Sequence, residues 1–122
     1  MTASPIRITA TKARRLLREV VAEAGRDYLA TDMCTYVHVT GERPHCIVGR
    51  ALYRAGVTLD ELSDMDDRTP TNIDRVRMPS RVRLTWPARM VLGKAQHAQD
   101  WGHPWGKALD EALSVRPWAA VA

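Results

Sequence analysis

The stretch CTYVHVTGERPHCIVGRALYRAG, residues 34 to 56, carries the strongest structural signal in this chain of 122 residues. Residues 35 to 40 alternate and are rich in β-branched and aromatic side chains, which is typical of a strand. Residues 41 to 44 are a turn signal, and residues 45 to 48 suit a returning strand. Apolar side chains then recur with helical spacing from residue 48 to residue 55. We therefore expect an antiparallel β-hairpin that leads into a short amphipathic helix.

Helices are predicted on both sides of this hairpin. Thr9 can cap a helix over residues 10 to 24, whose apolar side chains form one stripe. Thr58 and Glu61 have the spacing of a capping box, in which each side chain satisfies a free backbone amide at the helix start. A helix is therefore expected to begin directly after Thr58.

The last third of the chain predicts one strand and two helices. Residues 81 to 86 alternate basic and apolar side chains, so we expect a third strand beside the hairpin. Thr85 predicts a helix cap because Pro87 follows in the first turn. Pro104 predicts the start of the last helix.

Together these elements predict an α+β fold that is mostly helical, with four or five helices packed on a small antiparallel β-hairpin. A chain of 122 residues can bury one modest core. Residues 1 to 122 are therefore expected to form a single globular domain. Residues 1 to 8 and 117 to 122 are expected to be tails.

The composition is that of a globular protein of the cytoplasm. Apolar residues make up 45% of the chain and charged residues 26%. No apolar run approaches the roughly 20 residues that cross a bilayer, and residues 1 to 17 lack the apolar core of a signal peptide. We expect a cytoplasmic protein with no membrane partner and with its two cysteines reduced.

An acidic block directly precedes a basic block. Residues 61 to 74 carry five acids and one arginine, whereas residues 75 to 94 carry six bases and no acid. The basic block is expected either to pair with the neighbouring acids or to bind the phosphates of nucleic acid, with Trp86 stacked on a base. The arginines of the nucleic-acid alternative are Arg75, Arg77, Arg81, Arg83 and Arg89.

Two cysteines and two histidines lie within 13 residues, and they are the candidate zinc ligands Cys34, His38, His45 and Cys46. Structural zinc takes four such ligands in a tetrahedron. On a strand His45 and Cys46 point to opposite faces, so a four-ligand site requires a local distortion. The alternative is that Cys46 is a small core residue. A zinc-stabilised module is one hypothesis, and no other cofactor is indicated.

No motif indicates catalysis. Cys34 and His38 can meet on one face of a strand, as a thiolate and its base must. No glycine-rich turn beside them offers an oxyanion hole. The chain also lacks the phosphate-binding, dinucleotide-binding, serine-hydrolase and zinc-protease motifs. We therefore expect no catalytic residues and a protein that is not an enzyme.

Tryptophan is concentrated near the C-terminus, because all four tryptophans of the chain lie in its last third. Exposed tryptophan together with arginine is the usual composition of hot spots in protein interfaces. The residues that we expect to bind a protein partner are Trp86, Trp101, Trp118 and Arg89.

Two blocks of the chain carry a resemblance. The first block joins CTYVH at residues 34 to 38 with PHCIVGRAL at 44 to 52 and AGV at 55 to 57, and the second joins AQHAQD at 95 to 100 with PWGKAL at 104 to 109. Together they resemble small uncharacterised proteins of actinobacteria and their phages. The resemblance implies a small, cytoplasmic, mostly helical protein of phage origin, and it brings no catalytic residues. Our leading hypothesis is a non-enzymatic accessory protein that binds a host protein. The alternatives are a nucleic-acid-binding regulator and a zinc-stabilised module.

Overall fold

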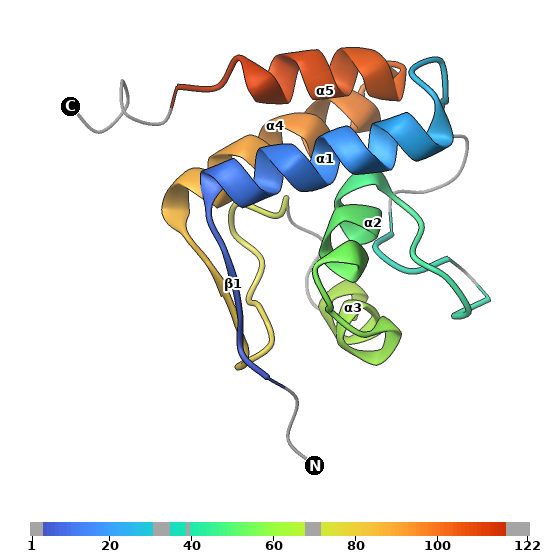
Figure 1. Ribbon diagram of the computed structural model, residues 1–122. Helices are drawn as coiled ribbons and strands as arrows, with labels where there is room; N and C mark the ends of the chain where they lie inside the picture. Colours follow the sequence, from blue (N-terminus) through green and yellow to red (C-terminus); the bar gives the residue numbers. More distant parts are fainter. Residues whose placement is uncertain (1–3, 31–34, 39, 68–71, 117–122) are drawn as a thin grey trace.

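The computed structural model describes residues 4–30, 35–38, 40–67 and 72–116. Within these ranges the chain forms two short strands and five helices (Figure 1). In chain order they are β1 (Ile6–Ile8), α1 (Ala10–Ala24), α2 (Ile47–Arg54), α3 (Leu59–Asp66), β2 (Val82–Leu84), α4 (Trp86–Asp100) and α5 (Trp105–Leu113). The prediction of a mostly helical α+β fold is confirmed. No helix in the described ranges has both the length and the apolar character that a membrane crossing requires.

β1 and β2 form a two-stranded parallel sheet. In its register Arg7 lies opposite Arg83, between two pairs of buried apolar residues. These pairs are Ile6 with Val82 and Ile8 with Leu84. Because side chains alternate along a strand, the apolar pairs face the core and both arginines face solvent.

Each strand of this sheet runs directly into a helix. Thr9 caps α1 by accepting a hydrogen bond from the amide of Lys12 at 3.2 Å. Thr85 caps α4 by accepting one from the amide of Ala88, also at 3.2 Å. The amide of Thr85 donates to the carbonyl of Ile8 at 3.1 Å, so the two helix starts lie side by side at one end of the sheet. Both predicted caps are confirmed.

The helices close over a continuous apolar core. α1, α4 and α5 lie side by side, and α2 packs against α1 and α4 (Figure 1). Every helix contributes a large side chain that is fully buried, and examples are Leu17, Leu52, Leu62, Leu92 and Trp105. The predicted capping box of Thr58 and Glu61 opens α3.

The predicted antiparallel hairpin is wrong. Among the described residues it is reduced to one isolated bridge between Val37 and Pro44. The cause is Asp66, whose two carboxylate oxygens accept the consecutive amides of Tyr36 and Val37 at 2.9 and 3.0 Å. Consecutive amides of an extended strand point in opposite directions, so this clamp is incompatible with a regular strand.

The start of α2 takes the place of the expected returning strand. Cys46 is the N-cap of this helix, and its Sγ accepts a hydrogen bond from the amide of Gly49 at 3.2 Å. Gly49 lies directly against the carbonyl of Tyr36, where a Cβ atom would collide with the backbone. The segment around Tyr36 therefore packs on α2. Among the described residues, its pairing with the returning chain is limited to the bridge at Val37 and the backbone hydrogen bonds around it.

The N-terminal segment differs from the expected tail. Residues 6 to 8 form β1, because the alternation IRI buries Ile6 and Ile8 in the core. The strand predicted at residues 81 to 86 is confirmed as β2, but its partner is β1 and the pairing is parallel. The tail expected at residues 117 to 122 lies outside the described residues.

Two buried glutamines of α4 anchor the neighbouring loops. Gln99 accepts the amide of Ile47 through Oε1 at 2.8 Å. Gln96 accepts the amide of Ile73 through Oε1 at 2.7 Å, and its Nε2 donates to the hydroxyl of Tyr36 at 3.2 Å. A buried amide is costly unless it is hydrogen-bonded. These contacts therefore hold the loops before α2 and before β2 against α4.

Candidate functional site

The exposed face of the parallel sheet carries two adjacent arginines. Arg7 and Arg83 are register partners, and neighbouring strands lie about 4.8 Å apart. Within the described part of the chain, neither arginine forms an ion pair with an acid. Like charges directly across a ladder destabilise a sheet. The pair is thus a feature that the stability of the fold does not explain.

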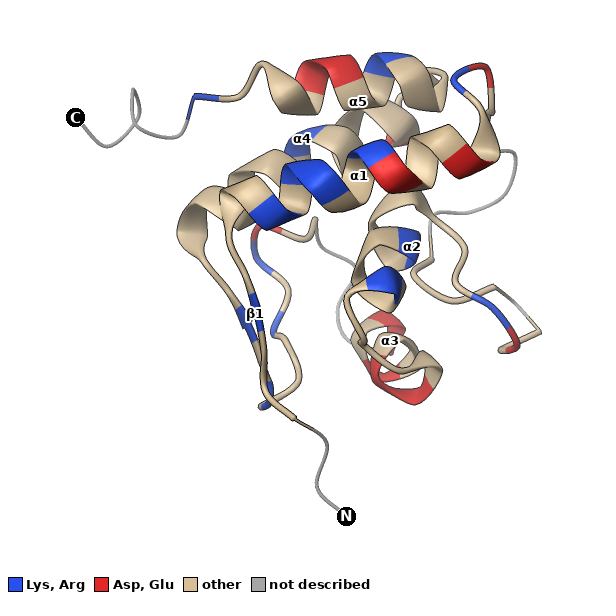
Figure 2. Ribbon diagram, viewed as in Figure 1, with Lys and Arg blue, Asp and Glu red and all other residues tan. Residues whose placement is uncertain are grey.

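Two more arginines lie on the segment that precedes β2. Arg75 and Arg77 are exposed and, counted over the described residues, have no acidic partner. We call Arg7, Arg75, Arg77 and Arg83 the arginine surface. Figure 2 shows basic residues on the sheet, on the segment before β2 and on the first half of α1, whereas acidic residues gather on α3. The expected pairing of this basic block with the acidic block is therefore not found for these arginines.

The other two arginines of the predicted set are committed to structural bonds. Arg81 binds Glu61 through two nitrogens, at 2.6 and 2.9 Å, and less than a fifth of either side chain is exposed. Arg89 donates from Nη1 to the carbonyls of Ile73 and Val76 at 2.8 and 2.9 Å. These bonds position the segment before β2, so Arg81 and Arg89 contribute to the site mainly by shaping it.

A cavity of about 400 Å³ lies where α1 and α4 begin. Its lining includes Arg7, Arg14 and the two cap residues Thr9 and Thr85. The N-terminus of a helix carries a partial positive charge. The end of the sheet that carries Arg7 is therefore favourable for anions.

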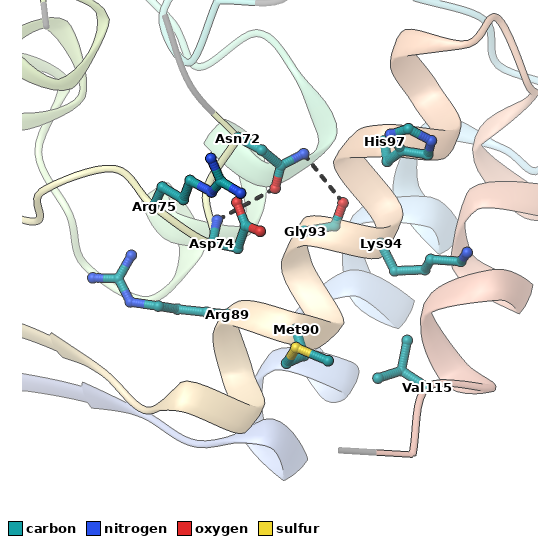
Figure 3. Close-up of a pocket in the computed structure, with 9 residues that line it drawn as sticks. All are labelled: Asn72, Asp74, Arg75, Arg89, Met90, Gly93, Lys94, His97 and Val115. Atoms are coloured by element: carbon teal, nitrogen blue, oxygen red, sulfur yellow. Dashed lines mark hydrogen bonds between the residues drawn. The ribbon is translucent and has the colours of Figure 1, made fainter. Parts of the chain in front are cut away.

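A larger open groove, of about 600 Å³, runs along α4 (Figure 3). We call it the α4 groove. It is lined by Asn72, Asp74, Arg75, Arg89, Met90, Gly93, Lys94, His97 and Val115. Gly93 allows the loop to lie on the helix, because a Cβ atom there would be 2.8 Å from Oδ1 of Asn72. Nδ2 of Asn72 donates to the carbonyl of Gly93 at 3.4 Å, which keeps the loop wall of the groove in place.

The predicted protein-binding residues do not form one cluster. Trp86 is 53% exposed and Trp101 is 73% exposed, but they stand at opposite ends of α4. Their separation of 15 residues corresponds to about 22 Å along the helix axis at about 1.5 Å per residue. Hot spots of protein interfaces cluster near the centre of the contact. Arg89 is bound to backbone carbonyls, and Trp118 lies outside the described residues.

The predicted zinc ligands are described only in part, because Cys34 lies outside the described residues. Cys46 is buried at the start of α2. The rings of His38 and His45 meet edge to face with centroids 5.2 Å apart, and Nδ1 of His38 lies 3.1 Å from the hydroxyl of Thr40. Where the structure describes the chain, no group of three or more His, Cys, Asp or Glu residues is placed to hold a metal ion. The zinc site stays a hypothesis, and so does the expectation that Cys34 and His38 are not catalytic.

Sequence reasoning missed Arg7, because residues 1 to 8 were assigned to a tail. The signal was the similarity of IRI at residues 6 to 8 to VRL at residues 82 to 84, each with an arginine between two buried apolar residues. It also missed that Lys94 lines the same groove as Arg75. Relatives supply no further signal, since comparison with protein families, curated proteins and solved structures finds no match for this chain.

Proposed function

We propose that this protein binds nucleic acid through the arginine surface and catalyses no reaction. The observation that carries the proposal is the pairing of Arg7 with Arg83 on the exposed face of the sheet. Two cations held across a ladder repel each other. A phosphate group that contacts both guanidinium groups would remove this repulsion and form charge-assisted hydrogen bonds.

The charge distribution of the whole molecule supports a polyanionic partner. The chain has a formal net charge of +4. Among the described residues, no acid of α3 forms an ion pair with the arginine surface, and Glu61 of α3 binds Arg81 instead. Contacts between arginine and phosphate release counterions, so binding of this kind weakens steeply as salt is added.

A protein partner, such as a host protein bound by a phage product, stays a prediction with less support. The prediction of a protein partner is based on the tryptophans expected to be exposed and on Arg89. Trp86 and Trp101 are separated by the length of α4, and Arg89 is held by the carbonyls of Ile73 and Val76. The described members of the predicted set therefore do not form a single compact hot spot.

The proposal is tested by fluorescence anisotropy with labelled single-stranded and duplex DNA of random sequence, over a range of salt concentrations. The wild-type protein is expected to bind at low salt, with an affinity that falls linearly on logarithmic axes. The double variant Arg7→Gln, Arg83→Gln is expected to bind at least about tenfold more weakly and with a shallower salt dependence.

The matched control is Arg43→Gln. Arg43 is an exposed arginine, and the turn that contains it lies across the molecule from the sheet (Figure 1). This variant loses one positive charge without touching the arginine surface, so its affinity should stay close to that of the wild type. The single variant Arg83→Gln also loses one positive charge, so it is the variant compared with Arg43→Gln. The proposal is overturned if the wild type binds neither form of DNA at low salt, or if Arg43→Gln weakens binding as much as Arg83→Gln does.

A further inference from the structure

We propose that the ligand of the α4 groove is single-stranded nucleic acid, with bases stacked on Trp86 and Trp101 and the backbone along the groove between them. This inference rests on the proposed function and specifies which form of nucleic acid the protein prefers. It unites residues that the sequence assigned to two different partners.

The two exposed tryptophans lie on the same face of α4 as the groove. Positions 86, 90, 93, 97 and 101 follow each other at intervals of three or four residues, which places them along one stripe of a helix. Met90, Gly93 and His97 line the groove. Trp101 is the C-cap of α4, and its ring lies 5.8 Å from that of His97. Along α4, one exposed tryptophan therefore precedes the residues that line the groove and the other follows them.

Positive charge flanks this stripe on both sides. Figure 3 shows Arg75 and Arg89 on one side of the exposed face of α4 and Lys94 on the other. Arg75 and Lys94 have no ion pair within the described residues, so both are available to phosphates. The lining carries one acid, Asp74, against these three cations. The groove thus favours an anionic chain.

The exposure of the two tryptophans favours single-stranded nucleic acid over a duplex. In a duplex the bases are stacked on each other and offer no free face to an indole ring. A single strand exposes its bases, and proteins that bind it combine a basic groove with aromatic side chains on which bases stack. The rise of roughly 22 Å along α4 between positions 86 and 101 accommodates about four or more nucleotides, at the lower end of the usual site sizes.

The arginine surface is continuous in sequence with this groove. Arg83 lies in β2, and Trp86 begins α4 after the single cap residue Thr85. A nucleic-acid strand that contacts the arginine surface can therefore reach Trp86 without crossing the molecule. The arginine surface supplies attraction to phosphate, and the groove supplies the preference for unpaired bases.

The test compares an oligodeoxythymidine of about 12 nucleotides with a duplex of the same length. Binding is followed by anisotropy of a labelled oligonucleotide and by quenching of tryptophan fluorescence. The variants are Trp86→Leu, Trp101→Leu and Lys94→Gln, with Tyr53→Leu as the control, because Tyr53 is an exposed aromatic residue outside the groove. Trp86→Phe serves as a conservative variant that keeps a ring for stacking.

The single strand is expected to bind about tenfold more tightly than the duplex and to quench tryptophan fluorescence. Each tryptophan-to-leucine change should weaken single-strand binding by roughly tenfold, whereas Trp86→Phe should recover most of that loss. Duplex binding and the Tyr53→Leu control should change little.

Three results would overturn the inference and leave the proposed function standing. One is equal affinity for the duplex; another is single-strand binding that both leucine variants leave unchanged. The third is competition by poly-glutamate as strong as that by the oligonucleotide, which would show that the groove recognises an acidic peptide or charge alone. Absence of binding to either form of DNA would instead remove the proposed function, and the inference with it.

Discussion

Gln96 accepts the backbone amide of Ile73 through Oε1 at 2.7 Å, and both residues are buried. The other end of the same side chain donates to the hydroxyl of Tyr36 at 3.2 Å. Burial raises the pKa of Tyr36, so this hydroxyl stays neutral and remains a good partner. One side chain of α4 therefore fixes two loops, and one of them forms the wall of the α4 groove.

Replacing Gln96 by leucine is expected to lower the free energy of unfolding by about 1–3 kcal/mol, because the buried amide of Ile73 loses its acceptor. Urea denaturation measures this loss. The control is Lys107→Gln on the exposed face of α5, which should change stability by less than about 0.5 kcal/mol. If Gln96→Leu lowers the free energy of unfolding by no more than the control does, the hydrogen bond between Gln96 and Ile73 does not stabilise the protein.

The contact between Gly49 and the carbonyl of Tyr36 predicts an effect opposite in sign to helix propensity. A glycine inside an exposed helix is less stable than alanine by about 1 kcal/mol, so propensity alone predicts that Gly49→Ala stabilises α2. The new Cβ atom would collide with backbone, and overpacking of this kind costs about 1–3 kcal/mol. Thermal unfolding of Gly49→Ala should therefore show a lower midpoint, and a higher one would contradict the placement of Tyr36.

The Glu61–Arg81 pair predicts a loss of stability in acid. Burial opposes ionisation of Glu61, but the hydrogen bonds from Arg81 and Thr58 outweigh it and lower the pKa of Glu61 below 4.5. A carboxyl whose pKa is lowered by folding stabilises the protein above its ordinary pKa and loses this effect as the pH falls through the folded value. At neutral pH the free energy of unfolding of the wild type should exceed that of Glu61→Gln by on the order of 1 kcal/mol. Unfolding at a series of pH values should show this difference vanish in acid.

Asp66 predicts the opposite dependence on pH. Burial raises its pKa above 3.8 and outweighs the amides of Tyr36 and Val37, which favour the ionised form. A carboxyl whose pKa is raised by folding contributes most below its ordinary pKa, and this contribution is lost as the pH rises through the folded value. The stability of the wild type relative to Asp66→Asn should therefore decrease on going from about pH 3 to about pH 7. An increase over that range would show that the two amides dominate.

The helix starts were predictable because their signals are local. Thr9, Thr58 and Thr85 each bind an amide three residues further along the chain, so the cap and its partner stand in one short window of sequence. The register pairing of Arg7 with Arg83 joins residues 76 positions apart, and no local pattern predicts such a pairing.

The expected hairpin failed for a similar reason. The alternation at residues 35 to 40 was a correct local signal for an extended segment, but Asp66 binds the amides of Tyr36 and Val37 from 30 and 29 residues away. In the candidate site, Arg75, Arg77 and Arg83 are exposed, as the nucleic-acid alternative predicted from the basic block requires. The burial of Arg81 against Glu61 could not be foreseen, because it depends on how α3 packs beside the sheet.

The repulsion between Arg7 and Arg83 predicts that stability and binding change in opposite directions. Replacing either arginine by glutamine removes a like-charge pair across the ladder, which should stabilise the fold by about 0.2–1 kcal/mol at low salt. The second replacement should add little, because the first has already removed the repulsion. Added salt should shrink the effect, since exposed charges are screened. Urea denaturation of both single variants and the double variant measures this, and the same proteins should bind DNA more weakly. Single variants that are less stable than the wild type at low salt would show that the two guanidinium groups do not repel each other in the folded protein.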